Sequence, residues 1–263
     1  MSQIQGVLLD VDGVLHVSMS PLPAAAAVLR WLGEKSYPFS CVTNTTTSSR
    51  STLARTLQSI GLPVEKEQLV TAPVATANYI RQHCPGKRCW LLTKGDTAED
   101  FAGIELTEDR ADLVVIGGAE ELFSYETMNR VFRLLMGGAE LLAMHSNLYW
   151  KTRQGLQLDS GPYVYALECA TGKQATVLGK PNRAFFEQAL NILNAPASAA
   201  IMVGDDLEND VQASQQAGLR GLLVTTGKHS TDSPLLQHIY PDAILPSIAD
   251  LPAWLENQAQ GDW

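Results

Sequence analysis

The fold of this chain is decided by Val7-Leu8-Leu9-Asp10-Val11-Asp12-Gly13. The apolar residues predict a buried strand, and Gly13 predicts a turn just beyond its end. Two carboxylates at the end of a buried strand are unfavourable unless their charge is compensated, and a bound cation would do this. One carboxylate could then act as a nucleophile and the other as an acid. Because Asp also starts ordinary turns, the pair alone only suggests such a site.

The composition indicates a folded globular protein and argues against some partners. The chain has 263 residues, of which 45% are hydrophobic and 18% are charged. That length is enough for one large domain or two modest ones. The net charge of -9 argues against nucleic acid as a partner, since its phosphates would be repelled. A small phosphorylated substrate remains compatible with this charge, because a metal ion reverses the local sign.

The cysteines and the apolar runs predict a cytoplasmic protein. Four cysteines occur without any CxxC pair, which is typical of a reducing compartment: Cys41, Cys84, Cys89 and Cys169. The start of the sequence lacks a basic region, and its apolar run is interrupted by Asp10, so no signal peptide is expected. No stretch is apolar and long enough to span a bilayer, and no membrane partner is expected.

Apolar runs alternate with helical patterns along the chain, which predicts an α/β fold with a doubly wound, Rossmann-like parallel sheet. The expected strands cover residues 6–11, 39–44, 89–93, 113–117, 140–144, 176–178, 200–204 and 221–225. The expected helices cover residues 23–34, 51–60, 73–82, 125–136, 164–170, 183–193 and 207–217. Residues 258–263 are expected to fray.

The distribution of motifs predicts two domains. All candidate site residues fall outside the middle of the chain, which carries strands and helices of its own. We therefore expect a catalytic core domain formed by residues 1–72 and 175–263. Residues 73–174 would form an inserted α/β cap domain.

A run of hydroxyl and amide side chains follows the second predicted strand, in Cys41-Val42-Thr43-Asn44-Thr45-Thr46-Thr47-Ser48-Ser49. These residues could simply cap the next helix. Alternatively, they could hold an anion together with backbone N–H groups and the helix dipole. A cap needs only one such residue, so the surplus favours the anion site modestly.

Two later segments add charge at the ends of apolar strands. Lys180 precedes a predicted helix; alone it would be an ordinary solvated lysine, but beside carboxylates it could balance charge and hold a phosphate. Asp205 and Asp206 end another strand, and Asp210 is placed four residues after Asp206, on one helix face with it. One of these acids could cap a helix, but three indicate a cation site that suits Mg²⁺.

These segments lie at or just beyond the carboxyl ends of predicted parallel strands, where open α/β sheets bind ligands. In their order they resemble motifs I to IV of the haloacid dehalogenase-like hydrolases: Asp10-Val11-Asp12-Gly13-Val14-Leu15, Thr43-Asn44, Gly179-Lys180-Pro181 and Gly204-Asp205-Asp206-x3-Asp210. The insertion resembles the large cap of type IIA members. Other stretches, such as Thr226-Gly227-Lys228, resemble one branch of that type. Many type IIA members carry a second Asn where this chain has Thr45.

The resemblance implies hydrolysis of a phosphate monoester through an aspartyl-phosphate. It implies that Asp10 is the nucleophile and that Asp12 protonates the leaving group and later deprotonates water. The implied Mg²⁺ ligands are Asp10, the backbone carbonyl of Asp12, and Asp205, with support from Asp206 and Asp210. The residues implied in binding the substrate phosphate are Asp12, Gly13, Thr43, Asn44, Thr45 and Lys180.

Several alternatives remain open at this point. The enzyme could cleave pyrophosphate or a P–N bond, or the chain could be a phospho-binding regulatory module without turnover. The stretch 145–153, His-Ser-Asn-Leu-Tyr-Trp-Lys-Thr-Arg, could line the site or form an ordinary pair of edge strands. His145 itself could be a hydrogen-bond donor behind the site or a structural histidine. The substrate is expected to be a small phosphorylated molecule, and the resemblance implies a homodimer.

Overall fold

A computed structural model describes residues 4–152 and 155–260 of the chain. The chain divides into two compact units. The first comprises Met1–Thr43, Leu53–Val70 and Lys180–Trp263, and the second comprises Asn44–Thr52 and Thr71–Gly179. The expected limits of core and cap at residues 72/73 and 174/175 stay predictions.

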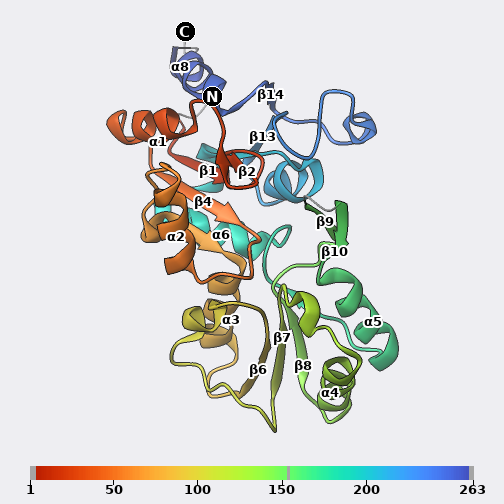
Figure 1. Cartoon of the computed structure of the whole chain (residues 1–263). Coiled ribbons are helices and arrows are strands. Elements are labelled where there is room, and N and C mark those ends of the chain that lie inside the picture. The colour runs from red at the N-terminus through yellow and green to blue at the C-terminus, as the bar shows by residue number, and fades with distance from the viewer. Residues whose placement is uncertain (1–3, 153–154, 261–263) are drawn as a thin grey trace. The chain divides into compact units, whose positions relative to one another are not determined.

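The first unit contains a six-stranded sheet that combines strands from the two ends of the chain (Figure 1). Its order is β14 (Ala243–Leu245), β13 (Arg220–Val224), β12 (Ala200–Gly204), β1 (Gly6–Asp10), β4 (Phe39–Thr43) and β5 (Leu69–Thr71). The chain builds outward from β1 through β4 to β5, and later outward from β12 to β14. The strand order therefore reverses between β1 and β12, which pair in parallel. Such a switch point is where this type of sheet binds ligands.

Helices cover both faces of this sheet because its strands are apolar on both sides. Alternate residues such as Val7 and Leu9 of β1 join a buried core with three helices on one face. These helices are α1 (Ala25–Glu34), α2 (Arg50–Ser59) and α8 (Leu251–Gln260). On the other face, α6 (Arg183–Leu193) lies against β1 and β4, and a π-helix (Leu207–Gln212) packs on Leu223. The predicted doubly wound α/β fold is confirmed.

The second unit has its own parallel sheet. Its order is β11 (Thr176–Val177), β8 (Glu140–Ala143), β7 (Leu113–Ile116) and β6 (Cys89–Leu92). One core contains α4 (Tyr125–Met136) and α5 (Gly161–Thr171), and the other contains α3 (Ala72–His83). β9 (Tyr149–Thr152) and β10 (Gly155–Leu158) form an antiparallel pair, so part of the stretch 145–153 does form edge strands. Arg153 lies outside the described residues.

Short elements complete the fold. The two-residue strands β2 (His16–Val17) and β3 (Ser20–Pro21) pair with each other. Single 3-10 turns occur at Lys66–Gln68, Thr97–Phe101, Glu120–Leu122, Ala197–Ala199, Pro234–Gln237 and Ile248–Asp250. Among the described residues, no helix is both long and apolar enough to cross a membrane.

Two sequence-based expectations about helices differ in part from the structure. The segment predicted as a helix over residues 207–217 is helical, but it begins as a π-helix (Leu207–Gln212) that continues into α7 (Ala213–Gln216). Residues 258–260 were expected to fray, but they belong to α8, which is fixed to the core by Leu251 and Leu255. The rest of that expected frayed segment, residues 261–263, lies outside the described residues.

Candidate active site

The site begins where β1 and β12 end side by side. Asp10 is the last residue of β1, and Asp205 directly follows the last residue of β12. The register pairs Leu9 with Val203, so the two strands deliver their carboxylates to the same edge of the sheet. This juxtaposition follows from the topology, because parallel neighbours at the switch point end together.

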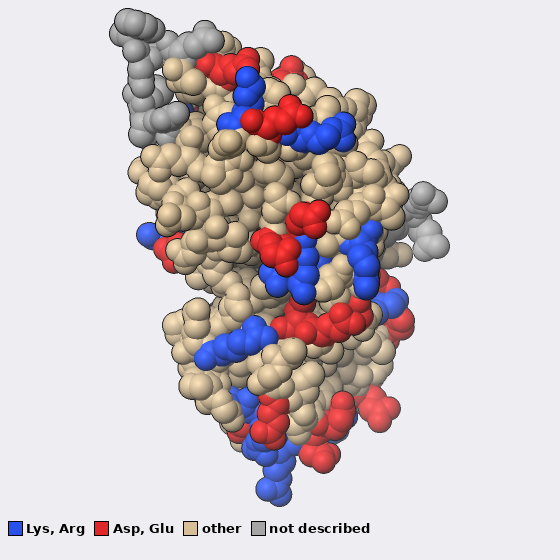
Figure 2. Space-filling view, turned by 90° about the vertical axis from the view of Figure 1, so that its left-hand side faces the viewer, with Lys and Arg blue, Asp and Glu red and all other residues tan. Residues whose placement is uncertain are grey.

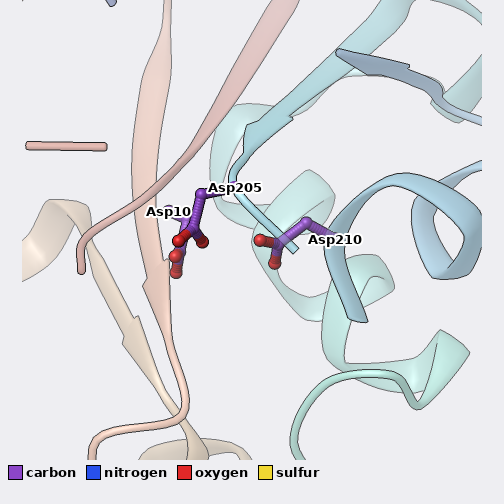
Figure 3. Close-up of side chains that lie close together, drawn as sticks. All are labelled: Asp10, Asp205 and Asp210. Atoms are coloured by element: carbon purple, nitrogen blue, oxygen red, sulfur yellow. The ribbon is translucent and has the colours of Figure 1, made fainter. Parts of the chain in front are cut away.

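Three carboxylates converge there. Asp10, Asp205 and Asp210 each offer one oxygen, and these oxygens lie within 4.8 Å of one another. The side chains point toward one another in Figure 3. All three residues are buried, with Asp210 wholly inaccessible. Buried like charges at this spacing are unfavourable, whereas a hard cation with oxygen ligands would make them favourable. The chemistry of this donor set fits Mg²⁺.

The side chain of Lys180 brings a positive charge into the carboxylate cluster. Its Nζ donates hydrogen bonds of 2.6 Å to Asp10 Oδ1 and 2.7 Å to Asp210 Oδ1. The ammonium is buried just before α6. Burial lowers the pKa of Lys180, but Asp10 and Asp210 outweigh it and raise the pKa above its ordinary value. Lys180 is therefore a permanent cation that fixes the orientation of Asp10.

The protein alone does not fully compensate the carboxylates. Burial raises the pKa of Asp10 to about 7, although Lys180 acts in the opposite direction. The pKa of Asp210 is likewise raised by burial to about 7, against Lys180. For Asp205, burial and the charge of Asp210 together raise the pKa to about 7. A second cation at this position would favour all three ionised forms.

A loop that follows β13 holds Asp205 in place. The backbone N–H of Lys228 donates to Asp205 Oδ2 at 2.6 Å. Gly13 and Gly227 pack so closely on this carboxylate that an added Cβ would lie 2.2 Å and 1.9 Å from Oδ2, respectively. Thr226 Oγ1 donates to the Gly13 carbonyl at 2.6 Å and joins the two glycine segments. The sequence predicted residues 226–228 only as a family feature and not in this role, although a glycine three residues after the end of a strand could have indicated it.

Asp206 differs from the expectation that it shares a helix face with Asp210. Its backbone is extended, and it caps the π-helix by accepting hydrogen bonds from the N–H groups of Glu208 and Asn209. Lys228 Nζ donates to its Oδ2 at 2.6 Å. Burial raises the pKa of Asp206, but the hydrogen bond and charge of Lys228, together with the hydrogen bonds from Asn209, outweigh burial and lower the pKa below its ordinary value. Because Asp206 precedes the helix instead of lying on it, only Asp210 turns into the carboxylate cluster.

Asp12 stands apart from the three converging carboxylates. Its side chain is 65% exposed, and its Oδ1 lies 3.5 Å from Nδ1 of the buried His16. An exposed carboxylate two residues after the buried nucleophile candidate remains accessible to a leaving group or to water.

The predicted phosphate-binding residues fall into both compact units. Thr43 is buried at the end of β4, next to β1. Gly13 and Lys180 also belong to the first unit, while Asn44 and Thr45 belong to the second. The roles of these residues stay predictions.

Comparisons with known proteins show which family the chain resembles. The profile of the haloacid dehalogenase-like hydrolases matches residues 7–107, and a related HAD-hydrolase-like profile matches residues 177–251. The chain is 39% identical over 226 residues to haloacid dehalogenase-like hydrolase domain-containing protein 2 of Bos taurus, covering 86% of each chain. It is 34% identical over 256 residues to the phospholysine phosphohistidine inorganic pyrophosphate phosphatase of Homo sapiens, covering 95% of this chain and 93% of that one.

Solved structures give the same result. A 4-nitrophenylphosphatase from Thermotoga maritima superposes with a TM-score of 0.90 at 27% identity, covering 95% of this chain and 97% of that one. The p-nitrophenyl phosphatase of Archaeoglobus fulgidus also gives a TM-score of 0.90 at 27% identity, covering 97% and 100%. The chain belongs to the haloacid dehalogenase-like hydrolases and is a phosphatase of their type IIA, as its motifs predict.

Proposed function

We propose that the chain is a Mg²⁺-dependent phosphatase that hydrolyses a small phosphorylated molecule through an aspartyl-phosphate on Asp10. The observation that carries the proposal is the buried cluster of Asp10, Asp205 and Asp210 at the switch point of the sheet, in which the Lys180 ammonium is bonded to Asp10 and Asp210. Catalysis of phosphoryl transfer depends mainly on in-line positioning of the reacting groups and on compensation of their charge. This cluster can supply both.

In the first step, an Asp10 carboxylate oxygen attacks phosphorus, and the bond from phosphorus to the leaving oxygen breaks. Asp12 gives its proton to that oxygen. In the second step Asp12 takes a proton from water, the water oxygen attacks phosphorus, and the bond to Asp10 breaks to release phosphate. Lys180 orients Asp10 throughout, and with Thr43, Asn44 and Thr45 it holds the phosphoryl oxygens.

Asp10 and Asp205 would hold Mg²⁺ through their carboxylates, Asp12 would add its backbone carbonyl, and Asp206 and Asp210 would support the ion. When bound, the ion neutralises the carboxylates and the charge of the phosphoryl group. Asp210 belongs to the carboxylate cluster with Asp10 and Asp205. This placement favours Asp210 over Asp206 as the supporting residue nearer to the ion.

The names of the relatives favour a phosphate monoester as the substrate, but they also support a second substrate class. Two solved relatives are described as nitrophenyl phosphatases, whereas the human relative is described by P–N and pyrophosphate substrates. A pyrophosphate or phosphoramidate hydrolase is therefore the second candidate. A phospho-binding regulatory module would accept one phosphoryl group without turnover.

We propose a small molecule as the physiological partner, in the cytoplasm, with no nucleic acid or membrane involved. On the face shown in Figure 2, acidic and basic side chains lie beside one another and no broad basic surface forms. Ion pairs such as Lys94 with Glu120 keep these charges balanced locally. A homodimer stays a prediction from the family resemblance.

The proposal is tested by phosphate release from para-nitrophenyl phosphate, phosphorylated metabolites, pyrophosphate and phosphohistidine, with Mg²⁺ and with EDTA. We expect multiple turnovers only with Mg²⁺, and a loss of about a thousandfold or more in Asp10→Asn. The exposed Asp232 provides a matched control, and Asp232→Asn should retain wild-type turnover. Near-normal turnover in Asp10→Asn would contradict the mechanism, and one stable phosphorylation without turnover would indicate the regulatory module.

A further inference from the structure

In the second unit, the carboxyl-end edge of the parallel sheet is covered by residues 46–52 of the chain. β6, β7 and β8 lead at this edge into residues 94–97, residues 117–118 and His145, respectively. An open α/β sheet usually binds its ligand here. In this unit, the edge instead holds the chain segment that directly follows Asn44 and Thr45.

Thr46 is held through its carbonyl and its hydroxyl. Its carbonyl accepts a buried hydrogen bond of 2.7 Å from Thr97 Oγ1, and its own Oγ1 accepts one of 2.7 Å from the Gly118 N–H. His145 Nε2 lies 3.4 Å from the same hydroxyl, and His145 Nδ1 lies 3.3 Å from Ser160 Oγ. His145 is thus buried, with hydrogen-bond partners inside this unit on both ring nitrogens. Three successive strand ends therefore converge on one threonine.

Asp96 fixes the next part of the segment. One carboxylate oxygen accepts from the Ser49 N–H at 2.8 Å, and the other accepts from Ser49 Oγ at 2.9 Å and Thr52 Oγ1 at 2.5 Å. Ser49 immediately precedes α2 and caps it, since its Oγ accepts from the Thr52 N–H at 3.2 Å. Asp96 therefore holds the capping residue from a distant part of the sequence and places a negative charge at the N-terminus of the helix.

The backbone between these anchors is in direct contact with the sheet edge. A Cβ added to Gly95, which has a φ of +71°, would lie 2.1 Å from the Thr47 carbonyl oxygen. A Cβ added to Gly118 would lie 2.8 Å from Thr46 Oγ1. Only glycine permits this approach at both places, so the edge is shaped for this segment.

We propose that Thr97 and Asp96 are positioning residues for the phosphate site. They fix the backbone of residues 46–52 and thereby the conformation of Asn44 and Thr45, which directly precede Thr46. The inference rests on the proposed function, in which those two side chains hold phosphoryl oxygens. Neither positioning residue contacts the substrate. Their loss weakens the binding of phosphate and leaves the metal site intact.

The test compares two fully buried threonines of the same unit whose hydroxyls both donate to backbone carbonyls; Thr97 also donates to the Lys94 carbonyl at 3.2 Å. Thr97→Val removes the bond to the Thr46 carbonyl, whereas Thr76→Val removes an equally buried bond of 2.8 Å to the Ala72 carbonyl within α3. Both variants should lower the Tm by similar amounts, about 2 to 4 °C. Thr97→Ser keeps the hydroxyl and serves as the rescue variant.

With para-nitrophenyl phosphate as substrate, Thr97→Val should raise the KM and the inhibition constant of inorganic phosphate by about three- to tenfold. Thr76→Val and Thr97→Ser should change neither, and Mg²⁺ binding measured by calorimetry should match wild type in all three. If the enzyme is active and Thr97→Val has the same KM and phosphate inhibition constant as Thr76→Val, the inference is overturned while the proposed function stands. Absence of turnover in wild type would overturn the proposed function and, with it, the inference.

Asp96→Asn provides a second variant in case Thr97→Val does not fold. It removes the charge that receives the Ser49 and Thr52 hydrogen bonds while keeping the size of the side chain. The inhibition constant of inorganic phosphate should rise by at least about threefold, again without a change in Mg²⁺ binding. An unchanged phosphate constant in this variant would equally overturn the inference.

Discussion

At the scale of single residues, the orientation of Asp205 depends on two glycines. Gly13 and Gly227 lie against its carboxylate, and Lys228 donates its N–H to Oδ2. This packing fixes one proposed metal ligand without using a side chain that could compete for the ion. The Thr226 hydroxyl joins the two glycine segments through the Gly13 carbonyl.

Gly227→Ala should weaken Mg²⁺ binding by about tenfold or more, because groups that contact a metal ligand and fix its orientation change the metal affinity on this scale. The added Cβ would meet Asp205 Oδ2 at 1.9 Å, so the carboxylate must move. Calorimetric titration with Mg²⁺ measures the effect directly. Gly33→Ala is the control, since its Cβ meets nothing within 4 Å. Wild-type Mg²⁺ affinity in Gly227→Ala would show that this loop does not position Asp205.

The sequence allowed the proximity of Asp10, Asp205, Asp210 and Lys180 to be predicted, because charged residues after apolar parallel strands meet at one edge. It did not allow the orientation of Asp206 to be predicted. Spacing of four residues implies a shared face only when both residues are helical, and the extended backbone at Asp206 removes that condition.

At the scale of elements, helix ends rely on side chains that the sequence makes recognisable. Ser124 accepts a hydrogen bond of 3.1 Å from the Thr127 N–H at the start of α4, whose predicted limits are those observed. Asn182 caps α6 in the same way through the Ala184 N–H. Both caps immediately precede the helices that the apolar spacing predicts.

Ser124→Ala should destabilise the protein by about 1 kcal/mol, because the first turn of α4 loses its side-chain acceptor. The corresponding fall in Tm is about 2 to 4 °C, measured by thermal unfolding. Ser124→Asp keeps an acceptor at the same position and should remain close to wild type. If Ser124→Ala and Ser124→Asp unfold at the same temperature as wild type, the cap makes no contribution.

The longer strands were predictable to within one or two residues because they are continuous apolar runs. The short strands β5 and β14 were missed, since three residues carry too little periodicity to separate a strand from a loop. The π-helix was also missed. Its apolar residues Leu207 and Val211 have ordinary helical spacing, and only the backbone distinguishes it from an α-helix.

At the scale of the whole molecule, alternation of strands and helices predicted a doubly wound fold but not which unit every segment joins. Residues 44–52 follow β4 of the first sheet, yet they pack with the second unit. Hydrogen bonds with Asp96, Thr97 and Gly118 hold them there, and each partner is at least 44 residues away in the sequence from the residue that it contacts. Local sequence patterns contain no information about such contacts.

The carboxylate cluster should make stability depend on both pH and Mg²⁺. Burial raises the pKa of Asp10, Asp205 and Asp210 to about 7, whereas an Asp in an unfolded chain titrates near 4. The folded protein therefore binds more protons than the unfolded chain between these values. Without metal, the contribution of these groups is largest below about pH 4 and is lost as the pH rises through about 7.

Mg²⁺ must displace those protons, so its stabilising effect should grow as the pH rises. We expect saturating Mg²⁺ to raise the Tm by at least about 3 °C more at pH 8 than at pH 6. Thermal unfolding at matched ionic strength, with Na⁺ as the control, separates binding from screening. An equal increase in Tm at both pH values would contradict a metal site whose carboxylates must lose protons when Mg²⁺ binds.

The central claim is that Asp10 is the nucleophile, and trapping its phosphorylated form tests this most directly. Wild-type protein is mixed with Mg²⁺ and para-nitrophenyl phosphate, quenched in acid during turnover, and reduced with borohydride, which converts an aspartyl-phosphate to homoserine. Mass spectrometry of the peptide that contains residues 10 and 12 should find homoserine at position 10 alone. Homoserine at another position, or its absence during rapid turnover, would contradict the account.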